Sequence, residues 1–207
     1  MFRDRLDAAR QLAGRLDHLK GEHALVLAIP RGGVPMGRLI ADALDGELDV
    51  VLVRKLGAPG NPEFAIGAVS EDGSIQLEEQ AHHYRDEVLA REVERQRARI
   101  AERRRRYTPV RSQIDPAGRV VVVVDDGSAT GATMASALTT LRQRQPKRLI
   151  AAIGVAPPDT LARIEALADE VICLESPSRF YAVGPFFADF AQVEDEEVVR
   201  LLGGRTP

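Results

Sequence analysis

The chain has 207 residues, which suits one globular domain with appendages, because compact domains commonly hold about 100–200 residues. Its 44% apolar and 29% charged residues are ordinary for folded proteins and exclude wholesale disorder. The formal net charge of −3 argues against a general nucleic-acid-binding protein. No run approaches the roughly 18 apolar residues of a membrane helix, and the first residues lack the apolar stretch of a signal peptide. We therefore expect a cytoplasmic protein with no membrane partner.

Apolar runs rich in β-branched residues predict five strands of the length expected in a buried sheet. They cover residues 24–29, 48–53, 120–124, 149–153 and 171–174. Helical patterns lie between most of them, at residues 34–44, 133–144 and 158–167. Strands that alternate with helices form parallel sheets with right-handed crossovers. The sequence thus predicts an α/β fold, with a five-stranded, mainly parallel sheet flanked by helices, in a single domain whose core covers about 21–55 and 119–175.

The connection from the second strand to the third is far longer than the roughly 10–12 residues that a crossover needs. We therefore expect an insertion at about 56–118. A turn at Glu71, Asp72 and Gly73 separates two stretches at 65–70 and 74–77, which indicates a β-hairpin. A charged helical pattern then covers residues 78–106. Its apolar side can pair with a second subunit in a homo-oligomer.

That helical pattern ends in four arginines, at residues 103–106. Such a run can grip phosphates or nucleic acid. No aromatic residues are interleaved to stack on bases, and arginine at a helix C-terminus also complements the helix dipole. The pattern therefore favours a solvated helix end over a nucleic-acid partner. Residues of about 1–20 and 176–207 are left to form a small hood.

The most informative stretch is residues 121–134. Four consecutive valines indicate a strand buried on both faces, and Asp125 and Asp126 follow at its carboxyl end, where open α/β sheets bind ligands. Small and hydroxylated residues then lead into a helix, so backbone N–H groups at its N-terminus can close around a phosphate. The alternative is a turn that only ends the strand and caps the helix. Such a turn does not require two aspartates followed by small and hydroxylated residues. The combination describes a site for a sugar phosphate, and the absence of a lysine after the turn excludes a Walker A loop.

These residues resemble the phosphoribosyl pyrophosphate signature of type I phosphoribosyltransferases over the contiguous positions 121–133. The resemblance implies that Asp125 and Asp126 bind the 2- and 3-hydroxyls of ribose. It also implies that the 5-phosphate is wrapped by Ala129, Thr130, Gly131, Ala132 and Thr133. Magnesium is the implied cofactor, held mainly by substrate oxygens, with Asp125 or Asp126 contributing through water.

Two further segments place cations at strand ends. Arg31, Gly32 and Gly33 follow the first strand and resemble the family's pyrophosphate loop, although alone they fit a simple glycine-rich turn equally well. Arg54 and Lys55 follow the second strand and resemble the pair with which several family members meet pyrophosphate. Cations that face a polyanion stabilise a leaving pyrophosphate. Arg31, Arg54 and Lys55 are therefore the expected catalytic residues.

Aromatic residues gather at positions 179–190 of a chain that has only 4% aromatic residues. This segment resembles the base-covering hood of purine phosphoribosyltransferases, which would place Phe180 or Tyr181 against the acceptor base. Packing of the C-terminal segment on the core explains the aromatic residues equally well.

The resemblance leaves the acceptor open. Enzymes of this family that act on 6-oxopurines carry an aspartate, the candidate base, where this chain has Ala129, and their base-selecting lysine is missing at 154–158. We expect a pentosyltransferase of nucleotide metabolism that moves ribose 5-phosphate from phosphoribosyl pyrophosphate to a nitrogenous acceptor and releases pyrophosphate. One alternative is a non-catalytic module that senses phosphoribosyl pyrophosphate or binds nucleic acid. A less favoured one is a hydrolase or phosphotransferase with Asp125 as nucleophile.

Overall fold

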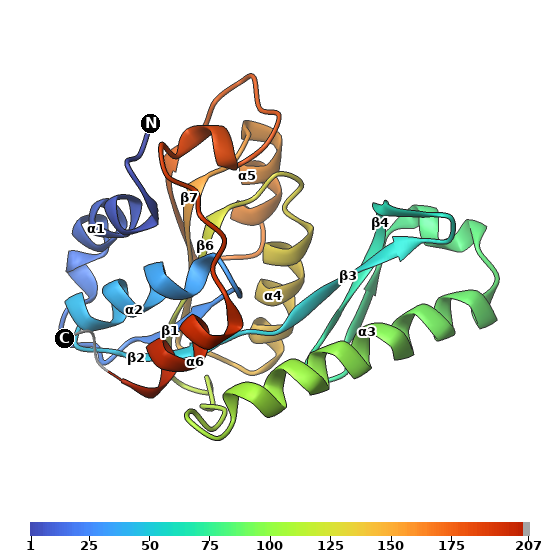
Figure 1. The fold of residues 1–207 in the computed structure, drawn as a ribbon, viewed down its shortest axis with the longest axis horizontal. Helices are drawn as coiled ribbons and strands as arrows, with labels where there is room; N and C mark the ends of the chain where they lie inside the picture. Colours follow the sequence, from blue (N-terminus) through green and yellow to red (C-terminus); the bar gives the residue numbers. More distant parts are fainter. Residues whose placement is uncertain (205–207) are drawn as a thin grey trace.

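A five-stranded sheet forms the centre of the molecule in the computed structural model, which describes residues 1–204 except the side chains of Pro62, Glu63 and Ala65 (Figure 1). Its strands are β1 (Leu25–Ala28), β2 (Glu47–Val50), β6 (Val120–Gly127), β7 (Arg148–Val155) and β8 (Glu170–Glu175). They lie in the order β2-β1-β6-β7-β8, and every neighbouring pair is parallel. The predicted α/β fold with a five-stranded parallel sheet is confirmed.

Helices cover both faces of this sheet (Figure 1). One face carries α1 (Arg5–Arg15) and α2 (Gly33–Ala43), with α6 (Asp195–Gly203) against α2, and the other carries α4 (Ala132–Gln143) and α5 (Pro158–Glu165). Alternate residues of β6 serve the two cores: Val122 and Val124 pack on the side of α1 and α2, and Val121 and Val123 pack on the side of α4. Burial on both faces explains why the strands read as continuous apolar runs.

The insertion is a second sheet with a long helix beside it (Figure 1). Its antiparallel strands are β3 (Val53–Ala58), β4 (Asn61–Ser70) and β5 (Ile75–Leu77). The hairpin of β4 and β5 was predicted, but β3 was not, because the apolar run at 48–53 divides between the two sheets. The long helix, α3 (Asp86–Tyr107), begins later than residue 78, since Glu79–His83 forms a 3-10 turn instead.

The N-terminal segment meets the segment before α6 beside the parallel sheet. The backbone N–H of Phe2 donates a hydrogen bond to the carbonyl of Phe186 at 2.8 Å, and the rings of Phe2 and Phe187 lie 5.1 Å apart between centroids. Short 3-10 turns at Asp17–Leu19 and Gly184–Phe186 complete these segments. The terminal segments that were expected to form a hood contain α1 and α6, two helices that the sequence patterns did not reveal, and both lie on the face of the sheet that carries α2.

The longest helix, α3, has 22 residues and ends in four arginines. None of the helices within residues 1–204 is both long and apolar enough to cross a membrane.

Candidate active site

A cavity of about 530 Å³ opens at the carboxyl ends of β1 and β6. The chain passes from β1 to β2 on one side while β6 lies on the other, so the cavity sits where the strand order reverses. Open α/β sheets bind ligands at such a point. Four separate segments supply the sequence-predicted residues in its walls: Arg31 and Gly32, Arg54 and Lys55, Asp125 and Asp126, and Thr133.

The two carboxylates at the end of β6 differ in their surroundings. The backbone N–H of Asp126 donates to Asp125 Oδ1 at 3.0 Å, and Arg5 Nε donates to Asp126 Oδ2 at 2.7 Å. Burial, followed by the charge of Asp126, raises the pKa of Asp125 well above the ordinary 3.8. Burial also raises the pKa of Asp126, but Arg5 opposes this shift. Asp126 therefore has a cationic partner within the chain, and Asp125 holds the less compensated carboxyl.

Arg5 connects the N-terminal helix and residues 190–191 to this site. It lies in the first turn of α1, its Nη1 donates to the carbonyl of Ala191 at 2.7 Å, and its guanidinium carbon lies 3.9 Å from the ring centroid of Phe190. A guanidinium on an aromatic face is a stabilising cation–π arrangement. Arg5 was not predicted from the sequence, because no local pattern signals a contact between positions 121 residues apart.

The turn after β1 must be glycine because other groups approach it closely. A Cβ atom on Gly32 would lie 2.0 Å from Asp126 Oδ2, and one on Gly33 would lie 2.5 Å from the carbonyl oxygen of Val124. The peptide bond between Pro30 and Arg31 is cis. Arg31 Nη1 then donates to Glu194 Oε2 at 3.2 Å, in the segment before α6. The predicted pyrophosphate loop thus packs directly on the predicted ribose carboxylate.

The predicted 5-phosphate segment forms the start of α4. Gly131 caps this helix with φ +76°, a left-handed conformation that favours glycine, and Thr130 Oγ1 accepts a long hydrogen bond from the backbone N–H of Ala132 at 3.4 Å. Thr160 Oγ1 donates to the carbonyl of Ala129 at 2.8 Å and holds the turn in place. The N-terminus of a 12-residue helix presents backbone N–H groups and a positive dipole end, which suit an anion. Thr133, in its first turn, lines the 530 Å³ cavity.

The opposite wall of the cavity comes from β3 and α3. Arg54 Nε donates to Gln96 Oε1 at 3.2 Å, and Gln96 Nε2 donates to Glu92 Oε1 at 2.7 Å. Burial lowers the pKa of Arg54, and Arg103 and Arg99 add to this effect. Glu92, Gln96 and Arg99 were not predicted from the sequence, whereas Arg103 belongs to the arginine run that was considered for binding phosphates. The spacing of four between arginines 95, 99 and 103 was the signal that could have revealed them, because such residues share a helix face.

The arginine run at the end of α3 is not simply a solvated helix end. Arg104 is mostly buried, and its guanidinium reaches Glu71 at 2.5 Å and Asp49 at 3.2 Å. Arg106 pairs with Asp195 at 2.9 Å, and Arg103 lines the cavity. The expectation of a solvated end fails for Arg104, which reaches β2 and the turn after β4, whereas the side chain of Arg106 is 54% exposed.

The aromatic residues proposed for the acceptor lie outside this cavity's lining. The ring of Phe180 stacks on that of Phe186, with centroids 5.6 Å apart, and the side chain of Tyr181 is 92% exposed. Their role toward an acceptor stays a prediction.

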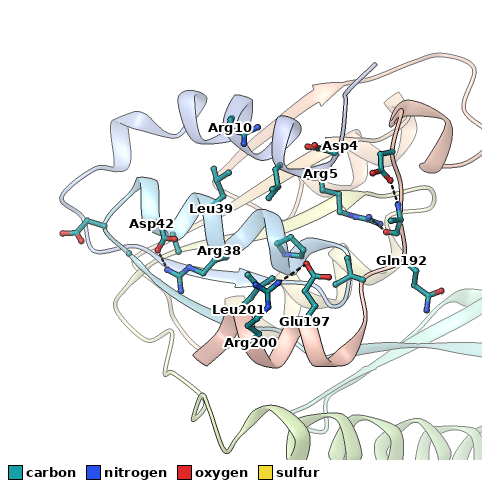
Figure 2. A pocket seen from close by; sticks show the side chains of 18 residues that line it. Asp4, Arg5, Arg10, Arg38, Leu39, Asp42, Gln192, Glu197, Arg200 and Leu201 are labelled. Atoms are coloured by element: carbon teal, nitrogen blue, oxygen red, sulfur yellow. Dashed lines mark hydrogen bonds and ion pairs between the residues drawn. The ribbon is translucent and has the colours of Figure 1, made fainter. Parts of the chain in front are cut away.

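A larger cavity, of about 820 Å³, lies along α2 between α1 and α6 (Figure 2). In its walls Arg38 pairs with Asp42 and Arg200 pairs with Glu197, while the buried Nε of Arg38 has no hydrogen-bond partner among the described residues. It contains neither the carboxylates of β6 nor the glycine turn. Size alone does not indicate the chemistry, so we place the candidate active site in the smaller cavity. Arg5 lines the larger cavity and also reaches Asp126.

Comparison with known proteins identifies the family of the chain. Residues 3–190 match the Phosphoribosyl transferase domain. Two Mycobacterium tuberculosis proteins, from strains CDC 1551 / Oshkosh and H37Rv and each named "Putative phosphoribosyl transferase", are 42% identical over 205 residues. The match covers 98% of this chain and 46% of each relative, so the chain spans about half the length of these relatives. The crystal structure of TT1426 from Thermus thermophilus is 47% identical, with a TM-score of 0.86 and full coverage of both chains. The chain therefore belongs to the phosphoribosyl transferase domain family.

Proposed function

We propose that this chain transfers the ribose 5-phosphate group of phosphoribosyl pyrophosphate to a nitrogenous acceptor and releases pyrophosphate. The observation that supports this most strongly is the 530 Å³ cavity, where Asp125 and Asp126 lie with Arg31, Arg54 and Lys55. Ionised carboxylates accept hydrogen bonds from sugar hydroxyls, and guanidinium and ammonium groups bind phosphate oxygens. A donor with a ribose in its middle and phosphates at both ends matches this distribution of charge.

The two ends of the donor would be bound by different groups of the protein. The 5-phosphate would bind to backbone N–H groups at the start of α4, in the segment from Ala129 to Thr133. The pyrophosphate would lie over the turn at Gly32 and Gly33, whose missing side chains let the turn pack closely on Asp126 and on the carbonyl of Val124. The ribose between them would rest on Asp125 and Asp126.

In the proposed reaction the bond between ribose C1 and a pyrophosphate oxygen breaks, and its electron pair leaves with pyrophosphate. The acceptor nitrogen supplies the pair for the new C1–N bond and passes its proton to water. Negative charge grows on the leaving group, so Arg31, Arg54 and Lys55 would stabilise the transition state electrostatically. Ala129 offers no titratable group, and we therefore propose an acceptor that needs no protein base at that position.

Magnesium is the cofactor that we propose, and its bound form would neutralise charge on the leaving pyrophosphate. Among the side chains that the structure describes, no three of His, Cys, Asp or Glu gather in a way that could hold a metal by themselves. Asp125 and Asp126 supply the oxygen ligands that magnesium prefers, and one or two carboxylates together with substrate phosphates form the usual magnesium site. The residues present therefore fit an ion that arrives with the donor.

Calorimetric titration with phosphoribosyl pyrophosphate, with and without magnesium, tests the donor site. We expect binding that needs magnesium and weakens when ribose 5-phosphate replaces the donor, because the pyrophosphate contacts are then lost. Combined Asp125→Asn and Asp126→Asn substitutions should weaken binding at least tenfold, since hydrogen bonds to charged groups contribute about 1.5–3 kcal/mol each. Asp115→Asn, at a carboxylate 68% exposed and paired with Arg144, is the matched control.

Release of pyrophosphate separates transfer from sensing. Donor binding followed by pyrophosphate release with any member of a panel of nitrogenous acceptors supports the transferase. Donor binding without release across the whole panel would favour a module that senses phosphoribosyl pyrophosphate. If the wild-type protein binds no donor, the proposed function is wrong.

A further inference from the structure

Arg99 and Arg103 lie on the side of α3 that faces the active site, and both line the 530 Å³ cavity opposite the carboxylates of β6. Their spacing of four residues places them one above the other on the same helix face. They also line a second cavity of about 250 Å³, and Arg54 belongs to both cavities. The second cavity thus adjoins the active site through a wall made of three arginines.

These two arginines differ from the other cations around them. Arg95, one turn earlier, pairs with Glu92 at 2.5 Å, and Arg106 pairs with Asp195 at 2.9 Å. In contrast, Arg99 and Arg103 form no hydrogen bond or ion pair with the part of the chain that the structure describes. Glu92, whose charge also acts on Arg99, is already paired with Arg95 and Gln96, so neither arginine has an ion-pair partner of its own among the described residues.

The acidic groups of the second cavity do not neutralise it. Asp195 already accepts hydrogen bonds from Arg106 at 2.9 Å and from the hydroxyl of Tyr107 at 3.1 Å, which leaves Glu102 as the other carboxylate in the lining. Like charges that converge on one space repel each other, and an anion that enters this space removes the repulsion. Arginine also presents a planar fork that matches carboxylate and phosphate oxygens.

We propose that Arg99 and Arg103 bind an anionic group of the acceptor, so that the acceptor carries a carboxylate or phosphate in addition to its nucleophilic nitrogen. This inference rests on the proposed function. The donor already has matching partners in the glycine turn, in the carboxylates of β6 and in the cations that follow β1 and begin β3. The 250 Å³ cavity contains neither the glycine turn nor those carboxylates, and it supplies additional cationic space beyond the donor site.

The combined variant Arg99→Gln and Arg103→Gln tests this subsite, with Arg105→Gln as the control. Arg105 is exposed on the same helix and lines neither cavity. Calorimetry should show a clearly smaller loss of donor affinity for the double variant than for Arg54→Gln. A loss of donor affinity as large as that of Arg54→Gln would overturn the proposal, because Arg99 and Arg103 would then bind the pyrophosphate itself.

Inorganic phosphate is the direct probe of the subsite. Titrated into protein saturated with donor and magnesium, it should bind in a salt-sensitive way, and the double variant should lose at least tenfold in that affinity while Arg105→Gln does not. Absence of phosphate binding in wild type, or equal binding in the double variant, contradicts the inference. If wild type binds no donor, the same titration without donor still decides the subsite separately from the proposed function.

Matched acceptors then show which anion the subsite takes. Pairs that differ in a charged group, such as uracil and orotate or nicotinamide and nicotinate, separate carboxylates from neutral rings, and phosphorylated amines represent the other source. Pyrophosphate release should occur with the anionic member of a pair, and the double variant should lose at least tenfold in kcat/KM for it. Equal rates with the neutral member would contradict the proposal.

Discussion

Arg5 Nε donates a hydrogen bond to Asp126 Oδ2 at 2.7 Å, and each side chain of this pair is only 12% exposed. The pair fills the space that a side chain at position 32 would need. It connects the N-terminal helix to the end of β6, so a residue outside the central sheet determines the surroundings of a carboxylate inside the candidate active site. As a result the two neighbouring carboxylates, Asp125 and Asp126, should respond in opposite ways to the same substitution.

Asp126→Asn should destabilise the protein. The substitution removes the negative partner of Arg5 and leaves a largely buried guanidinium without its ion pair, a change that costs about 3 kcal/mol. Urea denaturation should show a lower midpoint with an unchanged slope. Asp17→Asn, which breaks the exposed pair with Lys20, should change stability by less than about 1 kcal/mol. Equal effects of the two substitutions would show that the Arg5 pair is energetically no different from a surface pair.

Asp125→Asn should stabilise the protein at neutral pH while it weakens donor binding. Burial and the neighbouring Asp126 raise the pKa of Asp125, so ionising this carboxyl costs folding free energy. Asparagine keeps an oxygen that can accept the hydrogen bond from the N–H of Asp126 and removes the charge. Each kcal/mol gained corresponds to about 2–4 °C in melting temperature for a chain of this size. A lower melting temperature at pH 7 would contradict the inference that ionisation of the Asp125 carboxyl is unfavourable in the folded protein.

The advantage of this variant should depend on pH. Because the pKa of Asp125 is raised above its ordinary 3.8, the folded chain keeps a proton that the unfolded chain has already lost. The contribution of Asp125 to folding stability is therefore present at low pH, and it is lost as the pH rises through the raised pKa of this carboxyl. The difference in melting temperature between Asp125→Asn and wild type should be small near pH 4 and should grow toward neutral pH.

Only part of the candidate active site can be predicted from the sequence. The ribose and phosphate residues follow one another between positions 121 and 133, on one strand, turn and helix, so local chemistry was sufficient to predict their arrangement. Arg5 could not be predicted, because its contact with Asp126 exists only after α1 packs beside the sheet. Strand β3 was hidden inside an apolar run that serves two sheets. Arg99 and Arg103 did have a readable spacing, but only the packing of α3 shows that this face meets the active site.

Gly32→Ala should damage both stability and donor binding. The added Cβ would lie 2.0 Å from Asp126 Oδ2 and 3.2 Å from Arg5 Nε, so the ion pair must move or the turn must open. Gly14→Ala is the matched control, because a Cβ there meets no atom within 4 Å and alanine in a helix is favoured by about 0.5–1 kcal/mol. Thermal melting should shift down for the first variant and up for the second. Donor titration should show weakened binding for Gly32→Ala alone.

Tyr107 should make the stability fall at high pH. Its side chain is fully buried, its hydroxyl donates to Asp195 Oδ1 at 3.1 Å, and burial, followed by the charge of Asp195, raises its pKa from 10.0 to about 12. The unfolded chain loses this proton first, so the stabilising contribution is present below pH 10 and is lost between pH 10 and about 12. A shift of this size corresponds to roughly 3 kcal/mol. Between these pH values wild type should therefore lose more stability than Tyr107→Phe, as measured by urea denaturation.

Arg104 should act as a structural clamp and not as a ligand-binding arginine. Its guanidinium contacts Glu71 through two atoms, at 2.5 and 2.7 Å, and reaches Asp49 at 3.2 Å and the carbonyl of Val50 at 3.1 Å. Because the side chain of Asp49 is only 1% exposed, Arg104→Gln leaves a buried carboxylate without its cation, at a cost of about 3–5 kcal/mol. Arg105→Gln, on the exposed side of α3, should cost less than about 0.5 kcal/mol.

A double-mutant cycle makes this prediction specific to the ion pair. Adding Asp49→Asn to Arg104→Gln removes the unpaired charge, so the combined variant should be more stable than the sum of the two single losses predicts. Additive losses would mean that Arg104 acts through packing alone. Donor affinity of the folded variants should stay near that of wild type, since Arg104 does not line the 530 Å³ cavity, whereas neighbouring Arg103 does. Weakened donor binding in folded Arg104→Gln would instead place this arginine in the binding site.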